Sequence, residues 1–321
     1  MISISNFLSA RLPLFIVLMA AGTYFSPIHL KIATWFPSFL LGVIIFFAGL
    51  SMNIDSLKNI RRKTRELLLA TLLKWTLTVS ISIGLAYLFF SAKPGIAAGL
   101  ILAGTVPNAT AATVYTFLAG GNTSLVIAAS LVDIVISPIV APAAMLGLLS
   151  EQISISFFSL LQSFILIVIL PLGTGLVIQR SFPPFATYSK TVTRLGSSLA
   201  LLLIVHTLVG SGKAVISSEL GILPLLAFAT LIQVILPMTA AYFIAKKLHV
   251  HEEDARSMLF HAGLCNTALA AILAFGFIGE IGAIAPILNM IFNLSIGAFV
   301  SNWFAKNVEY SEEIIQQHVV K

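Results

Sequence analysis

Four ionisable side chains lie inside long apolar stretches of this sequence: Lys74, Asp133, His206 and His261. Lys74 stands about 12 Å along its stretch at the helical rise per residue, and Asp133 stands about 15 Å along its own. Charged groups in such surroundings are costly, and they usually mark an ion or substrate pathway. The chemistry that they predict is that of charge: a fixed cation that attracts an anion, a proton carrier, or an ion pair.

Asp133 is the only one of the twelve acidic residues that falls inside a predicted apolar helix away from its ends. It shares one helical face with Val126 and Ser130, at the spacing i, i+4, i+7. Two interpretations of Lys74 and Asp133 stay open, namely a structural ion pair and a pair of functional charges. His206 stands alone among Leu, Ile and Val and is predicted to be a packing residue.

Two apolar stretches are interrupted near their middle. Residues 104–110 contain Pro107, which removes a backbone donor and clashes with the preceding turn, and residues 261–267 contain His261. Backbone groups freed by a break cannot face lipid, so a break must be buried or line a polar cavity. Each following half-helix would point its positive N-terminal end at that cavity. The alternative is a simple kink, healed by Thr and Asn side chains. The substrate-binding candidates at these breaks are Thr105, Asn108, Thr110, Asn266 and Thr267.

The elements that must position these residues are membrane helices. Of 321 residues, 58% are apolar and only 9% are charged, and the mean hydropathy is +1.03, whereas soluble domains carry about 25% charged residues. A helix needs about 20 apolar residues to cross the hydrocarbon core. The sequence predicts an all-α integral membrane protein with ten transmembrane helices, over residues 11–26, 33–52, 66–90, 95–119, 123–148, 155–178, 192–211, 220–244, 256–279 and 282–304.

Basic residues predict the orientation of these helices. Fourteen of the eighteen Lys and Arg residues fall on the side of the N-terminus, and only Lys31, Lys93 and Lys213 fall on the other. We therefore expect the protein to span the inner (plasma) membrane of the cell, with both termini in the cytoplasm. A signal peptide at the N-terminus is the alternative to the first helix. The net charge of +6 is explained by the basic residues of these loops and does not indicate nucleic-acid binding. The single cysteine, Cys265, excludes an internal disulfide.

The two halves of the chain resemble each other. Residues 70–74 read Ala-Thr-Leu-Leu-Lys and residues 229–233 read Ala-Thr-Leu-Ile-Gln, while Asn108 begins a segment similar to the one that Asn266 begins. Each half would hold five helices, so the second half would enter the membrane from the opposite side. Such inverted repeats are common in secondary transporters, with the site near the membrane midplane. The predicted units are residues 1–154, residues 155–306 and a cytoplasmic tail, 307–321.

At the fourth, fifth and ninth helices the sequence resembles the bile acid:sodium symporter family. Residues 107–113 correspond to the family's Pro-Gly-Gly-Thr-Ala-Ser-Asn-like break, and residues 115–122 follow it with a familiar Tyr-Thr-Phe-Leu-Ala-Gly-Gly-Asn. Residues 261–271 correspond to the family's Glu-Val-Gly-Met-Gln-Asn-Ser-Gly-Leu-Ala-Ala pattern. The resemblance implies a panel domain of helices 1, 2, 6 and 7. It also implies a core domain of helices 3–5 and 8–10, in which the broken helices 4 and 9 cross.

The sequence departs from this family where the family binds sodium. The resemblance places the first sodium site at Ala112, Thr113, Val126, Ser130 and His261, and the second at His261, Cys265 and Lys74. Hard cations prefer oxygen ligands that carry negative charge, whereas these positions offer an ammonium group, an imidazole and a thiol. We therefore expect the fold without the two-sodium coupling. Among the remaining polar residues, Thr110, Asn266 and Asn293 match positions that line the family's substrate crevice.

These observations lead to the hypothesis of a secondary transporter for a small organic anion, such as a bile-acid-like or pantoate-like carboxylate, that works by alternating access. The expected partners are this anion and the lipid bilayer, with no nucleic acid, no cofactor and a monomeric state, and the coupling ion stays open between sodium, a proton and none. The alternatives are a cation/proton antiporter, an intramembrane hydrolase using Ser130 or Cys265 with His261 and Asp133, and a sensor or structural protein. A hydrolase would leave the internal repeat unexplained and lacks the sequence context of a nucleophile.

Overall fold

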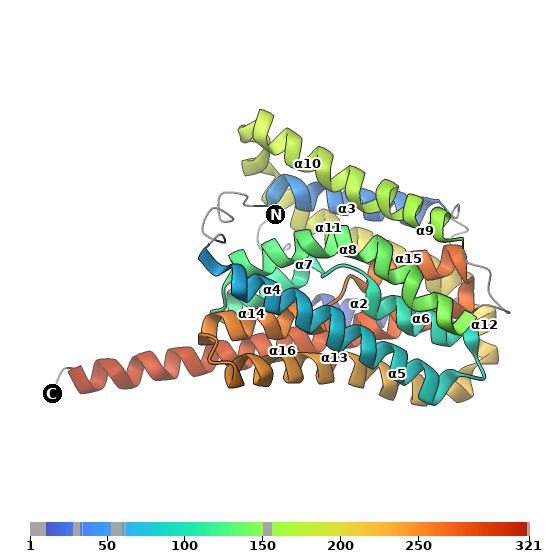
Figure 1. Ribbon diagram of the computed structural model, residues 1–321. Coiled ribbons are helices and arrows are strands. Elements are labelled where there is room, and N and C mark those ends of the chain that lie inside the picture. Colours follow the sequence, from blue (N-terminus) through green and yellow to red (C-terminus); the bar gives the residue numbers. More distant parts are fainter. Residues whose placement is uncertain are drawn as a thin grey trace.

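A computed structural model describes residues 11–27, 33, 35–52, 60, 62–149 and 156–319, without the side chains of 146–149, 183–194 and 307–319. Several basic residues that entered the predicted charge bias lie outside the described backbone or side chains: Lys31, Lys58, Arg61, Lys190, Arg194 and Lys321. Within the described ranges every regular element is a helix (Figure 1).

The first half of the chain contains α2 (Leu12–Phe25), α3 (Phe36–Ser51), α4 (Thr64–Leu73), the π-helical turn η2 (Lys74–Thr78), α5 (Val79–Phe90), α6 (Pro94–Thr105), α7 (Thr110–Leu118) and α8 (Thr123–Leu149). The second half contains α9 (Phe157–Phe164), the π-helical turn η3 (Ile165–Ile169), α10 (Leu170–Ser181), α11 (Pro183–Ser211), α12 (Lys213–Ser218), the 3₁₀ turn η4 (Leu220–Ile222), α13 (Leu223–Lys247), α14 (Glu252–Gly263), α15 (Thr267–Phe277) and α16 (Glu280–Val319).

Length and composition make this an integral membrane helical protein. Among the described residues, five continuous helical stretches are long and apolar enough to cross a bilayer: Thr64–Phe90, Thr123–Met145, Phe157–Ser181, Leu220–Lys247 and Glu280–Lys306. Five further apolar helices have 10–17 residues. The sequence thus predicted the membrane class and the helical elements.

Most helix ends lie within a few residues of the sequence prediction, and two differ by more. The last helix was expected to end at residue 304, but α16 continues to Val319 and projects beyond the bundle (Figure 1). The segment after residue 304 contains neither Gly nor Pro and is rich in Glu, Gln and Lys, so nothing stops the helix there. The seventh helix was expected to begin at residue 192, but α11 begins at Pro183, because proline is favoured in the first helical turn.

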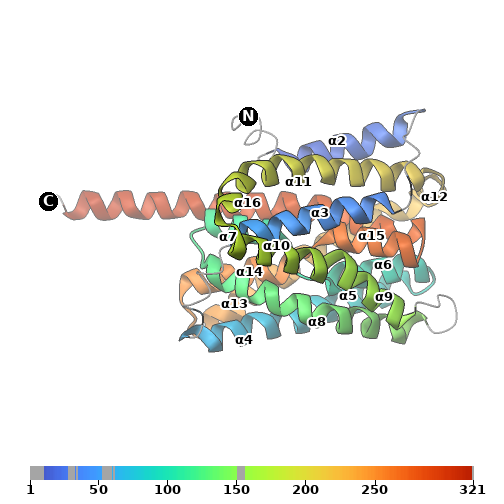
Figure 2. The same ribbon diagram turned by 90° about the horizontal axis from the view of Figure 1, so that it is seen from above.

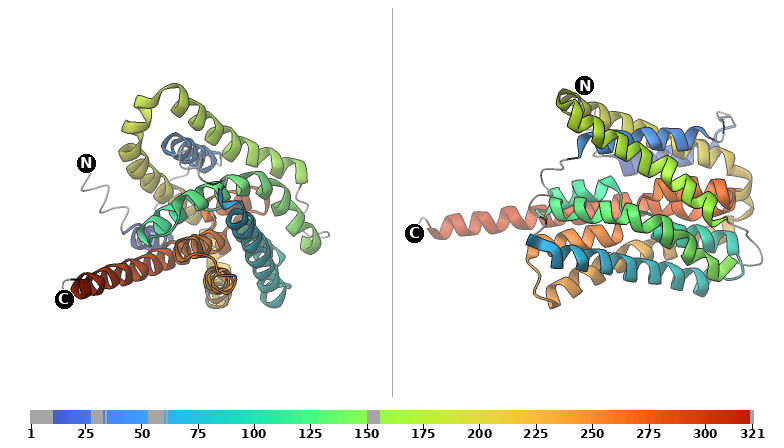
Figure 3. Two further views of the ribbon diagram at one scale, coloured as in Figure 1. Left: turned by 60° about the vertical axis from the view of Figure 1, so that its left-hand side comes forward. Right: turned by 45° about the horizontal axis from the view of Figure 1, so that its top comes forward.

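The helices pack in two groups. The first consists of α2, α3, α10 and α11, where α3 packs on both α10 and α11, and α11 packs on α2. The second contains α4–α8 and α13–α16, with extensive packing of α13 on α14, α15 on α16 and α6 on α16. The right-hand view of Figure 3 shows the blue and yellow-green helices of the first group above most of the remaining helices, whereas α16 overlaps α3 and α11 in the view of Figure 2.

Both predicted helix breaks are present, and they contact each other. The chain is extended between α6 and α7, where Pro107 lies, and again between α14 and α15. The backbone N–H of Ala109 donates to the carbonyl of Leu264 at 3.0 Å, and that of Asn266 donates to the carbonyl of Pro107 at 2.8 Å. These two bonds form a short antiparallel bridge that satisfies backbone groups which could not face lipid. The bridge pairs Asn108 with Cys265, one residue away from the sequence match of Asn108 with Asn266.

Candidate functional site

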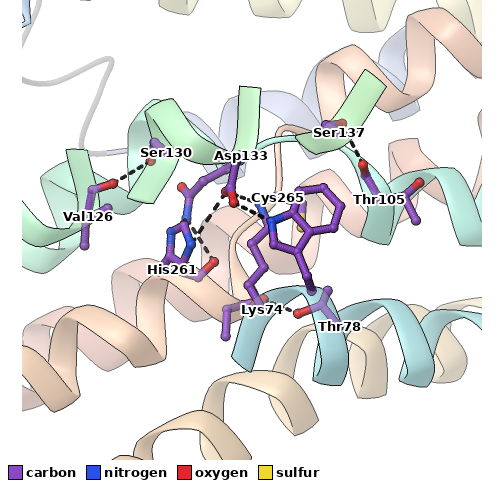
Figure 4. Close-up of polar contacts among 12 residues, drawn as sticks. Lys74, Thr78, Thr105, Val126, Ser130, Asp133, Ser137, His261 and Cys265 are labelled. Carbon is purple, nitrogen blue, oxygen red and sulfur yellow. Dashed lines mark hydrogen bonds and ion pairs between the residues drawn. The ribbon is translucent and has the colours of Figure 1, made fainter. Parts of the chain in front are cut away.

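Lys74 and Asp133 form an ion pair in the interior of the second helix group. The ammonium Nζ of Lys74 donates to Oδ2 of Asp133, and both side chains are fully buried (Figure 4). Lys74 begins the π-helical turn η2, and such turns inside α-helices frequently occur at functional sites because they redirect side chains. Of the two interpretations left open by the sequence, pairing of the two charges is confirmed, and a functional role is compatible with it.

Two further donors complete the surroundings of the Asp133 carboxylate. The indole Nε1 of Trp75 donates to Oδ1 at 2.8 Å, and the backbone N–H of Asn108 donates to Oδ2 at 3.2 Å. Asp133 therefore joins η2 and α8 to the break after α6. A buried charge is tolerated when it is paired and hydrogen-bonded, and both conditions hold here.

The buried ring of His261 lies next to this pair. The amide Nδ2 of Asn108 lies 2.9 Å from both Nδ1 and the backbone carbonyl of His261. The carbonyl can only accept, which fixes the orientation of the amide, so Nδ1 must also accept and a neutral ring carries its proton on Nε2. Nε2 lies 3.6 Å from Oδ2 of Asp133, outside hydrogen-bond distance. The Oδ1 atom of Asn108 is buried without a hydrogen-bond partner among the described residues.

A small cavity of about 60 Å³ lies between the two helix groups, next to the breaks. Its apolar walls include Ile45, Ala48, Met52 and Leu172 from the first group and Val168 from η3. On the opposite side, its polar lining residues are Asn108, Thr110, Thr113, Ser130 and Asn266. Ligand sites for small molecules typically measure about 300–1,000 Å³, so this cavity must enlarge before an organic anion can enter.

The predicted site residues fall into two sets. Asn108, Thr110 and Asn266 line the cavity, as do Thr113 and Ser130 from the positions that correspond to the family's sodium site. The remaining candidates are buried elsewhere in the same region and do not line it: Thr105, Ala112, Val126, Cys265, Thr267 and Asn293.

Hydrogen bonds explain several of these placements. The side chain of Thr105 donates to the carbonyl of Ile101, and that of Asn293 donates to the carbonyl of Cys265 at 2.8 Å, so both stabilise helix geometry and packing. The hydroxyl of Ser130 donates to the carbonyl of Val126 rather than to His261, which does not fit the nucleophile of the hydrolase alternative. His206 is partly buried and contacts the hydroxyl of Thr23 through Nδ1 at 2.8 Å, and its packing role stays a prediction.

A second polar pair joins the other half of the chain. Gln233 on α13 accepts from Nδ2 of Asn289 on α16 at 2.7 Å, and its own Nε2 donates to Ser82 and to the carbonyl of Leu100. Gln233 is the residue that the sequence match relates to Lys74. The second helix group thus contains a charged Lys–Asp pair, between η2 and α8, and a neutral Gln–Asn pair, between α13 and α16.

Sequence reasoning did not identify several residues of the site. Trp75 carried a signal, since it is an indole donor adjacent to a buried lysine, but its partner could not be read from the chain. The apolar wall formed by α3 and α10 had no signal, because Ala48 and Leu172 resemble any other residues of a membrane helix.

The family of this chain follows from comparison with known proteins. The sequence model of the sodium bile acid symporter family matches residues 38–219, more than half of the chain. An uncharacterized sodium-dependent transporter, YocS of Bacillus subtilis, is 26% identical over 311 residues, which cover 95% of this chain and 94% of that protein. Another uncharacterized Bacillus subtilis protein, YbaS, is 23% identical over 82% of this chain and 87% of its own length.

A third relative comes from a plant. The probable sodium/metabolite cotransporter BASS1 of Arabidopsis thaliana chloroplasts is 22% identical over 75% of this chain and 59% of its own length. The chain belongs to the sodium bile acid symporter family, as its resemblance to that family predicted. It is therefore a multi-pass membrane transporter and not an enzyme.

Proposed function

We propose that this protein is a secondary transporter of a small organic anion and that it works without the two sodium ions of its family. The observation that carries the proposal is the ion pair between Lys74 and Asp133, because it places an ammonium group where the resemblance expects a sodium ligand. The names of two relatives describe sodium-dependent or sodium/metabolite transport. We expect this chain to differ in its sodium requirement, because the side chains at its expected sodium positions are not those that a sodium ion prefers.

The residues at the expected sodium positions do not fit a hard cation. Both oxygens of Asp133 already receive hydrogen bonds, from Lys74, Trp75 and the backbone of Asn108. Ala112 and Val126 offer no side-chain oxygen. To bind the carboxylate of Asp133, a sodium ion would have to displace the Lys74 ammonium group and leave that buried cation without the partner it has here, which is strongly unfavourable.

An organic anion suits the groups that line the cavity. Thr110 and Asn266 offer a hydroxyl and an amide to the cavity. The helix α7 begins at the cavity without a side-chain cap, and the backbone N–H groups at a helix N-terminus favour binding of an anion. The corresponding end of α15 is capped by Oδ1 of Asn266, which accepts from the backbone N–H of Leu269. A small carboxylate, bile-acid-like or pantoate-like, is the proposed substrate class.

The proposed architecture is an inverted repeat of five helices in residues 1–154 and five in residues 155–306, with both termini in the cytoplasm. The first helix group would be the panel domain and the second the core domain, with the breaks of helices 4 and 9 crossing in the core. Support comes from the bridge between the two breaks and from the packing of the two groups. Alternating access would then enlarge the cavity by rocking one group against the other. A monomer is sufficient for this mechanism.

Uptake by proteoliposomes tests the proposal. Radiolabelled taurocholate and pantoate serve as probes, with equal potassium, choline or sodium gradients across the membrane. We expect saturable uptake of at least one probe at the same rate in all three salts. A strict and saturable requirement for sodium would contradict sodium independence. Cation flux without uptake of either probe would favour the cation/proton antiporter.

A further inference from the structure

The buried charges of the site cancel before any substrate arrives. Lys74 and Asp133 carry opposite charges and form one pair, so together they offer no net charge to a monoanion in the cavity. An anion moved into a low-dielectric site needs a counter-charge nearby. His261 is the neighbouring group that can supply one by binding a proton. The titratable groups that face its ring are Asp133 from α8 and Lys74 from η2, and Cys265 lies on the segment that follows α14.

The hydrogen bonds of His261 connect its protonation to the cavity wall. In the neutral ring Nδ1 accepts from Nδ2 of Asn108, and Asn108 lines the cavity. A proton added to Nδ1 removes that acceptor and places two N–H donors against each other. The amide could turn so that its unpartnered Oδ1 accepts from the new N–H. Oδ1 would then lie against the carbonyl oxygen of His261, which accepts from Nδ2 in the present structure, and two oxygen acceptors would meet. Protonation therefore breaks the present contact of Asn108 with the ring of His261.

We propose that His261 is a proton-binding site and that Asn108 transmits its protonation to the substrate cavity, so that one proton accompanies each organic anion. This proposal rests on the function proposed above. The proton adds to the Nδ1 lone pair while the cavity is open to one side, and the released Asn108 amide offers its N–H groups to the anion. On the other side the anion leaves, the proton leaves Nδ1, and Asn108 returns to the ring. Each cycle moves one proton and one negative charge and is electroneutral.

The proton site can be tested without any substrate, through Trp75. Its indole donates to Asp133, beside the His261 ring, so its fluorescence should report a new charge there. In a protein that carries both Trp35→Phe and Trp303→Phe, Trp75 is the single remaining tryptophan. We expect a pH-dependent step in its fluorescence that His261→Gln abolishes, because glutamine can still accept from Asn108 but does not titrate. His206→Gln, a control remote from the cavity, should keep the step.

Two results would overturn the proton site. The first is a fluorescence step that persists in His261→Gln and disappears in Asp133→Asn, which would assign the proton to the carboxylate. The second comes from ¹⁵N-histidine NMR of the unmodified protein in detergent, which needs no folded variant. The ring nitrogens of His261 should show the Nε2–H form at high pH and a protonated ring at low pH. A ring that stays neutral between about pH 5 and 8 would exclude the role.

Transport provides the second arm of the test. In sodium-free proteoliposomes an inward proton gradient should accelerate uptake of the taurocholate or pantoate probe, and His261→Gln should remove the acceleration. Because one proton binds with each anion, the apparent affinity for the probe should fall by up to about tenfold per pH unit above the transition. Uptake that ignores the gradient would overturn the coupling. No uptake of either probe, with a normal Trp75 titration, would overturn the proposed function and support the proton site.

Discussion

Lys74 and Asp133 are the residues whose chemistry most clearly separates this chain from a generic membrane bundle. An unpaired charge at the bilayer centre costs on the order of 2.5–3.5 kcal/mol on insertion scales. Pairing offsets part of that penalty, yet a neutral pair can also join two buried helices, as Gln233 and Asn289 join α13 and α16. The charges are therefore not required for helix packing alone.

The neutral pair suggests a prediction at the residue scale. Lys74→Gln and Asp133→Asn should each lower the free energy of unfolding, by about 3–5 kcal/mol, because each leaves its partner charged and buried. The double variant copies the Gln–Asn pair and should recover most of this loss, while anion uptake stays impaired. Melting temperatures and uptake of the four proteins measure the coupling. Additive losses would show that the two charges do not interact.

The ion pair between Lys93 and Glu219 is a matched control. It likewise joins a lysine to a carboxylate, with Nζ of Lys93 2.7 Å from Oε1 of Glu219. The Lys93 side chain is 42% exposed, whereas both members of the buried pair are fully buried. The variants Lys93→Gln and Glu219→Gln should each change stability by about 0–1 kcal/mol, because exposed ion pairs contribute little.

At the scale of elements, the site depends on close packing of the helix that precedes the first break. Almost every residue of α6 is buried, and it crosses α16 so closely that a Cβ atom on Gly99 would lie 1.9 Å from the carbonyl oxygen of Gly282. Small residues allow such approach between membrane helices. The contact fixes α6, and with it the position of Pro107 and Asn108.

Substituting this glycine tests the contact. Gly99→Ala should destabilise the protein by about 1–3 kcal/mol, because the obstacle is backbone and cannot rotate away. Gly84→Ala, on the exposed side of α5, meets nothing within 4 Å and should be neutral or stabilising by about 0.5–1 kcal/mol. Thermal unfolding of both variants in the same detergent gives the comparison. Equal melting temperatures would show that α6 and α16 can separate without cost.

At the scale of the whole molecule, function requires the two helix groups to move relative to each other. The cavity between them holds about 60 Å³, and its walls come from α3 and α10 on one side and from α7 and α8 on the other. The described conformation therefore leaves no room for an organic anion at the site. Opening must carry Ala48 and its neighbours away from the breaks.

Cysteine labelling tests this movement. In a Cys265→Ser background, which removes the single native cysteine, Ala48→Cys should react with a membrane-impermeant maleimide added from either side of proteoliposomes. Ala98→Cys, fully buried on α6, should stay unreactive. Saturating probe anion should slow the reaction at Ala48→Cys. Labelling from one side only, under every imposed gradient, would contradict alternating access.

The sequence by itself determined the membrane class, the helical elements and the two breaks, because apolar length and a mid-helix proline act locally. It also identified Lys74, Asp133 and His261, because a charge in an apolar stretch is visible without coordinates. Only the tertiary structure decided which of them meet, since Lys74 and Asp133 come from different helices and η2 changes the direction of Lys74. It alone separated the cavity residues Asn108, Thr110 and Asn266 from Thr105, Thr267 and Asn293, because the face that a buried polar side chain presents depends on helix packing rather than on residue type.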